Sequence, residues 1–111
     1  MKNILRFRKN IYCPNDEYIL ASVSVDVYWD GVWIHIGELN KVSQKYIWGA
    51  GSYQWYWGFT HEIAQHMGTR GERNQPLYVS KRKIKRQFLE NLRYFGGYLN
   101  KKAKQENDDG L

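Results

Sequence analysis

An alternating segment at residues 18–39 constrains the fold of this chain more than any other feature. Apolar side chains occupy every second position from 19 to 29, whereas residues 22, 24 and 26 are small or polar. Asp30-Gly31 follows, which is a preferred pair for a two-residue type I′ turn, and the apolar alternation then resumes over residues 32–36. The sequence therefore predicts a β-hairpin with one buried face.

The two-residue turn also predicts the register of this hairpin, because residues at equal distances from the turn lie opposite each other. On the apolar face the expected pairs are Trp29 with Val32, Val27 with Ile34, and Val25 with Ile36. On the opposite face they are Tyr28 with Trp33 and Asp26 with His35.

Shorter elements are expected on both sides of the hairpin. Leu5, Phe7 and Ile11 share one parity and predict a first strand that ends near Cys13-Pro14. Two further short strands are expected at residues 46–48 and 53–59, around the glycine-containing turn 49–52. Thr60 is the predicted N-cap of a short helix, His61–Met67, and a polar loop is expected from residue 68 to residue 76.

A long basic helix is predicted to begin after Ser80. Its apolar residues recur at helical spacing and mark the face that packs on the sheet: Ile84, Phe88, Leu92, Phe95 and Leu99. Gly96-Gly97 is expected to end the helix early. The resulting fold class is α+β: an antiparallel sheet of four to five strands, built around the DG hairpin, with a short helix and the long C-terminal helix on one face. Residues 1–104 are expected to form one domain, followed by a disordered acidic tail at 105–111.

Positive charge is concentrated at the two ends of the predicted domain. The formal net charge is +6, and residues 81–104 carry nine cations against one acid, Glu90. Five of these cations crowd the first two turns of the long helix: Lys81, Arg82, Lys83, Lys85 and Arg86. The field of the helix N-terminus opposes each exposed cation in the first of these turns by about 0.3–1 kcal/mol. This pattern indicates an anionic partner, and the alternative interpretation is a solvated face that keeps the protein soluble.

The favoured hypothesis is a non-catalytic protein that binds RNA or single-stranded DNA. The residues expected to hold phosphates are Arg82, Lys83, Arg86 and Arg93 on the helix, with Arg6, Arg8, Arg70 and Arg73 extending the surface. The aromatic residues expected to be exposed for recognition are Tyr28, Trp33, Trp48 and Tyr56. Trp55 and Trp57 are expected in the core.

Two other functions remain open. A short, aromatic-rich chain could be an inhibitor of the phage or mobile-element type that binds a host protein through its aromatic and basic surface. A metal-independent nuclease is the second alternative, with His35 beside Asp26 as the base. No residue is assigned a catalytic role, because the local pattern contains no activated nucleophile.

Metal, cofactor and membrane interactions are not expected. His61 and His66 are five residues apart, whereas the helical zinc-protease motif places its histidines four apart on one face. The single cysteine, Cys13, excludes an internal disulfide and a multi-cysteine metal site. No segment has the length and apolarity of a signal peptide or a membrane span, so a cytoplasmic protein is expected.

Overall fold

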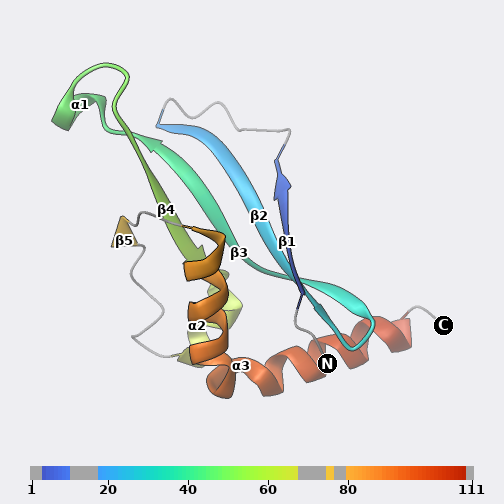
Figure 1. The fold of residues 1–111 in the computed structure, drawn as a ribbon. Coiled ribbons are helices and arrows are strands. Elements are labelled where there is room, and N and C mark those ends of the chain that lie inside the picture. The colour runs from blue at the N-terminus through green and yellow to red at the C-terminus, as the bar shows by residue number, and fades with distance from the viewer. Residues whose placement is uncertain (1–3, 11–17, 68–74, 77–79, 110–111) are drawn as a thin grey trace.

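The computed structural model describes residues 4–10, 18–67, 75–76 and 80–109. An antiparallel sheet has its strands in the order β1-β2-β3-β4-β5, so that each strand pairs with its neighbour in the sequence. The strands are β1 (Ile4–Lys9), β2 (Ile19–Trp29), β3 (Val32–Ser43), β4 (Tyr53–Phe59) and the two-residue β5 (Gln75–Pro76). The helices are α1 (Lys45–Trp48), α2 (His61–Met67) and α3 (Lys81–Asp109) (Figure 1). The predicted α+β class is confirmed.

The core lies between α3 and one face of the sheet. The buried stripe of α3 follows the predicted periodicity and consists of Ile84, Phe88, Phe95, Leu99 and Ala103, with Leu92 partly buried beside it. The opposing side chains come from the central hairpin and are Val25, Val27, Ile34 and Ile36. Trp57 of β4 and Ile63 of α2 complete the core. Burying a side chain of this size contributes about 1.5–3 kcal/mol, so this contact is the main source of stability.

The DG hairpin forms as predicted near its turn. Asp30 and Gly31 have φ values of 47° and 88°, the positive pair that a type I′ turn requires. The expected partners are confirmed for Trp29 with Val32, Tyr28 with Trp33, Val27 with Ile34, and Asp26 with His35. The prediction for Val25 was wrong, because Val25 pairs with Gly37 and Ile36 is an extra residue at a β-bulge.

The bulge places Gly37 beneath the ring of Trp57. A Cβ atom at Gly37 would lie 2.5 Å from Cη2 of Trp57 and 2.5 Å from the carbonyl oxygen of Gly58. Both distances are well below van der Waals contact, so only glycine allows β4 and its tryptophan to approach β3 this closely.

Residues 46–48 form a helical turn, α1, and the predicted strand there was wrong. β3 and β4 pair as far as Ser43 and Tyr53, so residues 44–52 belong to their connection. The Trp48 N–H donates to the Gln44 carbonyl at 2.8 Å, which closes one turn of helix within that connection. The apolar side chains of this turn are left exposed at the end of the β3–β4 pair, away from the red part of α3 (Figure 1).

α3 continues through Gly96-Gly97 and includes residues 105–109, so both the early end and the disordered tail were wrong for these residues. Later turns of α3 are tied to the hairpin. The Trp29 indole Nε1–H donates to Oδ1 of Asn100 at 2.8 Å, and the Asn107 amide donates to the Asp30 carbonyl at 3.2 Å. Figure 1 shows the helix changing direction between its orange and red parts.

The predicted helix caps are confirmed. The Ile63 N–H lies 3.4 Å from Oγ1 of Thr60, and the Lys83 N–H donates to Oγ of Ser80 at 3.1 Å. In the expected loop at residues 68–76, the last two residues instead form β5, which pairs with β4. The rest of that loop, and the predicted strand end near Cys13-Pro14, lie outside the described residues. Among the described helices, none combines the length and apolarity needed to cross a bilayer.

Two glycine substitutions should have opposite effects on stability. Gly37→Ala should lower the free energy of unfolding by about 1–3 kcal/mol, because the added methyl group forces β4 away from β3. Gly97→Ala should raise it by about 0.5–1 kcal/mol, because Gly97 is helical and exposed and a Cβ there meets no atom within 4 Å. Urea denaturation measures both, and wild-type stability of Gly37→Ala would contradict the close packing of Trp57.

Candidate anion-binding surfaces

The first two turns of α3 carry five exposed cations, of which Lys81 lies over the ring of Phe7. The other four form the basic end of α3: Arg82, Lys83, Lys85 and Arg86. The first turn of this helix contains no acidic residue. Within the described part of the chain, no carboxylate forms an ion pair with any of the four. Lys83 stands three residues after the N-cap Ser80, where a capping box would place Glu or Gln. Positive charge therefore gathers where local helix stability favours negative charge.

Arg93 lies on the same exposed stripe as Arg82 and Arg86 but has a protein partner. Its guanidinium donates to the Tyr94 hydroxyl at 2.7 Å and lies 4.8 Å from the centroid of that ring. Arg82 and Arg86 are about 6 Å apart along the helix axis, and Arg93 is about 10 Å further on. Arg82, Lys83 and Arg86 therefore lie close together at the start of α3, with Arg93 at a distance.

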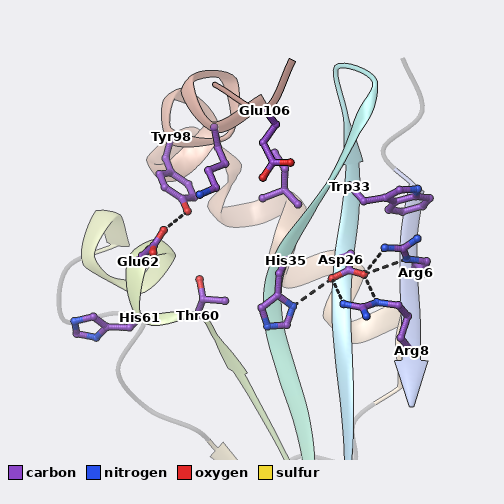
Figure 2. Close-up of a pocket in the computed structure, with 12 residues that line it drawn as sticks. Arg6, Arg8, Asp26, Trp33, His35, Thr60, His61, Glu62, Tyr98 and Glu106 are labelled. Carbon is purple, nitrogen blue, oxygen red and sulfur yellow. Dashed lines mark hydrogen bonds and ion pairs between the residues drawn. The ribbon is translucent and has the colours of Figure 1, made fainter. Parts of the chain in front are cut away.

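A second cationic group, the Asp26 cluster, consists of Asp26, Arg6, Arg8 and His35 (Figure 2). The Arg6 Nε and Nη2 atoms lie 3.1 and 2.9 Å from Oδ2 of Asp26. The Arg8 Nε atom lies 2.6 Å from Oδ2, and its Nη2 lies 3.2 Å from Oδ1. The His35 Nδ1 atom is 3.2 Å from Oδ1. One carboxylate therefore holds three basic side chains.

Strand alternation places this cluster on the sheet face opposite α3. Leu5 and Phe7 of β1 pack against the core, so Arg6 and Arg8 point to the other face. Arg6 pairs directly with Asp26 in the β1–β2 register, and His35 pairs with Asp26 in the β2–β3 register. Asp26 is 1% exposed, which makes it a buried charge in the middle of the sheet.

The environment of Asp26 keeps its carboxyl group ionised. Burial alone would raise its pKa, but hydrogen bonds from Arg8, Arg6 and His35, together with the charge of Arg8, lower the pKa below its ordinary value. The same carboxylate raises the pKa of the Arg8 guanidinium. His35 has a second acidic neighbour, since its Nε2 lies 3.6 Å from Oε1 of Glu38. Both ring nitrogens thus face carboxylates, an arrangement that does not favour His35 as the base of a nuclease.

Two of the predicted aromatic residues adjoin this cluster. The rings of Tyr28 and Trp33 meet edge to face with centroids 5.1 Å apart, and Cζ of Arg6 lies 4.2 Å from the Trp33 centroid. Tyr56 is partly buried on the same face, and its hydroxyl lies 3.3 Å from Nε2 of Gln44. Trp48 stands apart on α1 and is 75% exposed. The four rings therefore do not form one recognition surface.

Two adjoining cavities open beside the Asp26 cluster. β4 ends at Phe59, opposite Gly37, so no strand among the described residues pairs with this edge of β3 at residues 33–35. The first cavity, about 430 Å³, lies at this edge and is lined by Arg6, Arg8, Asp26, Trp33, Thr60 and Lys102, among others (Figure 2). The second, about 400 Å³, lies over β3 and β4 and shares His35, Thr60 and His61 with the first.

One wall of the first cavity is fixed by a contact between α2 and α3. The Tyr98 hydroxyl donates a short hydrogen bond to Oε2 of Glu62. Burial, and then this hydrogen bond and the charge of Glu62, raise the pKa of Tyr98 to about 12. The phenol therefore stays protonated and keeps the two helices together.

The two histidines of α2 are separately engaged. His61 lies 3.0 Å from Nε2 of Gln65, whereas the His66 ring packs 5.2 Å from the ring of Tyr98. Within the ranges that the structure describes, no three His, Cys, Asp or Glu side chains gather into a possible metal site.

The structure separates the predicted phosphate-binding residues into two groups. The helix residues lie on the outer side of α3, whereas Arg6 and Arg8 lie beyond the sheet and are bound to Asp26. Arg70 and Arg73 lie outside the described residues. Sequence reasoning found the Asp26–His35 contact but missed the convergence of both arginines on Asp26. The available signal was a lone acid in the central strand and two arginines of one parity in the first.

Replacing the central carboxylate should weaken the fold and change its response to acid. Asp26→Asn should lower the free energy of unfolding at pH 7 by about 2–3 kcal/mol, less than the range for fully buried pairs because both arginines are half-exposed. Since the pKa of Asp26 is lower in the folded state, its contribution is complete above about pH 4 and is lost as the pH falls below that value. Urea denaturation from pH 7 to pH 2 measures both effects. A variant that loses stability in acid as steeply as wild type would contradict this assignment.

Comparisons with protein-family models, curated proteins and solved structures find no match to this chain.

Proposed function

We propose that this protein binds RNA or single-stranded DNA, without catalysis, through the basic end of α3. The observation that carries this proposal is the set of four exposed cations, Arg82, Lys83, Lys85 and Arg86, without a carboxylate partner among the described residues. Cations that served only solubility would be more favourable near the C-terminus of α3, where the helix field attracts positive charge.

A phosphate group at this position satisfies two requirements at once. It neutralises four side chains that repel one another, and the helix field opposes the two in the first turn, Arg82 and Lys83, by about 0.3–1 kcal/mol each. It also accepts hydrogen bonds from the guanidinium groups, whose planar fork suits phosphate oxygens. Binding then removes a local destabilisation, so phosphate contacts here stabilise the complex and the helix together.

Exposed aromatic rings favour unpaired nucleic acid over duplex. Tyr53 is 53% exposed and lies under Lys41, with Nζ 3.9 Å from the ring centroid. Both residues share the strand parity of the face that α3 covers, and Tyr46 and Trp48 follow in the β3–β4 connection. Rings beside cations can stack bases, and each stack contributes about 1–3 kcal/mol.

One observation favours the second candidate, an inhibitor that binds a host protein. The side chains of Tyr46, Ile47 and Trp48 are 72%, 69% and 75% exposed, and contiguous exposed apolar groups of this size are typical of protein-binding sites. This candidate predicts that Trp48→Ala abolishes capture of a protein target, whereas the nucleic-acid proposal depends on α3.

The salt dependence of oligonucleotide binding tests the role of the helix. An Arg82→Gln/Arg86→Gln variant should bind single strands more weakly, and the slope of log affinity against log salt should fall by about 1.4, or 0.7 for each lost contact. A Lys101→Gln/Lys104→Gln variant removes the same charge from exposed positions later in α3 and should keep the wild-type slope. Equal slopes for all three proteins, measured by fluorescence anisotropy, would exclude this site.

A substitution that improves the helix should damage binding. Lys83→Glu completes a capping box with Ser80 and should raise the free energy of unfolding by about 0.5–1 kcal/mol. The same change places a carboxylate among the cations and should weaken oligonucleotide affinity more than Lys83→Gln does. Chemical denaturation and anisotropy on the same samples measure the two effects, and a gain in stability with unchanged affinity would argue against the proposal.

A further inference from the structure

We propose that the cavity beside the Asp26 cluster binds a nucleotide by its terminal phosphate, either as a free mononucleotide or as the 5′-phosphorylated end of a strand. This site lies at the edge of β3, where the Asp26 cluster faces α2 and the later turns of α3. The inference does not depend on the function proposed for the basic end of α3. It follows from four observations: unused donors, a fixed geometry, an aromatic surface and the charges of the facing wall.

The first observation is that Asp26 uses only part of the hydrogen-bonding capacity of its arginines. A guanidinium has five N–H donors, and Asp26 accepts hydrogen bonds from two nitrogens of each arginine. About three donors on each side chain have no protein partner among the described residues. One carboxylate also balances only one of the two guanidinium charges, so the pair retains a net positive charge. The side chains of Arg6 and Arg8 are 40% and 49% exposed, which leaves them open to a ligand.

The second observation is that these donors are held in place before any ligand arrives. The Asp26 side chain is 2% exposed and bridges both guanidinium groups, so their orientation is set by the centre of the sheet. Long basic side chains ordinarily lose conformational freedom when they bind a ligand. Arginines that are already fixed avoid much of that loss, which is how a buried carboxylate contributes to a binding site.

The third observation is an aromatic ring at the same cavity. Trp33 contributes to its lining and remains 36% exposed, and Arg6 lies over part of the indole. Figure 2 shows the indole next to the Arg6 guanidinium on the β1 side of the cavity, with the Arg8 guanidinium beyond Arg6. A nucleobase can therefore stack on Trp33 while its phosphate meets Arg6 and Arg8.

The fourth observation limits the ligand to one phosphate group. The polar side chains of the facing wall include Lys102, His61 and Thr60. Glu62 of the same wall accepts a hydrogen bond from the Tyr98 hydroxyl. Glu106 also lines this wall and would repel a second or third phosphate. The volume of about 430 Å³ lies in the usual range for small-ligand sites and suits a mononucleotide. These features together select a nucleoside monophosphate over a triphosphate.

Titration calorimetry with the intact protein tests the site, using adenosine 5′-monophosphate, adenosine 5′-triphosphate, adenosine and inorganic phosphate. The monophosphate should bind about tenfold more tightly than adenosine, because a charged hydrogen bond is lost without the phosphate. It should also bind more tightly than the triphosphate. A hexanucleotide with a 5′-phosphate, compared with its 5′-hydroxyl form, tests the strand end.

Two variants and two controls assign the binding. Arg8→Gln should lose at least about tenfold in affinity for the monophosphate, and Trp33→Leu, which leaves the Asp26 hydrogen bonds intact, should weaken the monophosphate but not inorganic phosphate. Lys9→Gln removes a charge from the neighbouring position of β1, on the other face, and should bind as wild type does. The Arg82→Gln/Arg86→Gln variant should also bind the monophosphate normally, which separates this site from the helix surface.

The same measurements distinguish a site for a free mononucleotide from a site for a strand end. Binding of the free monophosphate identifies a small-molecule site, and a preference for the 5′-phosphorylated strand alone identifies a strand-end site. The inference is overturned if no phosphate-bearing probe binds, or if Trp33→Leu and a folded Arg8→Gln protein both bind as tightly as wild type.

Discussion

The apolar contact between α3 and one face of the sheet is the interaction on which the other features depend. Phe88, Phe95 and Leu99 are fully buried there, and their burial fixes which side of the helix faces outward. The basic end of α3 is exposed as a result of that orientation. The same contact covers only one face of the hairpin, so Asp26 and its arginines lie on the other. One packing arrangement therefore produces two cationic surfaces that point in different directions.

Local patterns predicted the parts of the fold that local physics decides. Alternation and Asp30-Gly31 predicted the hairpin and its register near the turn. The bulge was not predictable, because Ile36 satisfies the apolar pattern in either register and only Gly37 hints at the close approach of Trp57. The prediction that Gly96-Gly97 ends the helix was wrong, because contacts made far along the chain outweigh the local preference of glycine. Burial of Leu99 and Ala103 and the side-chain contacts of Asn100 and Asn107 outweigh the poor helix propensity of glycine.

The candidate sites divide in the same way. Helical periodicity predicted the long helix that carries Arg82, Arg86 and Arg93, and the two-residue turn predicted the contact between Asp26 and His35. The contact of Arg6 and Arg8 with Asp26 could not be predicted from the sequence, because no two-residue turn fixes the register between β1 and β2. Exposure of individual rings was equally undetermined, since both faces of β4 carry large aromatic side chains and only the position of α3 decides which are covered.

The strand order affects how this chain reaches its folded state. Every strand pairs with the next one in sequence, so the sheet can assemble from short-range contacts in a zipper-like order. The helix that covers it comes last, and residues such as Trp29 and Asn100, 71 positions apart, can meet only at the end. During synthesis the valine- and isoleucine-rich face of the hairpin is exposed to solvent until α3 emerges from the ribosome. That interval is when a nascent chain is most prone to aggregate and most in need of a chaperone.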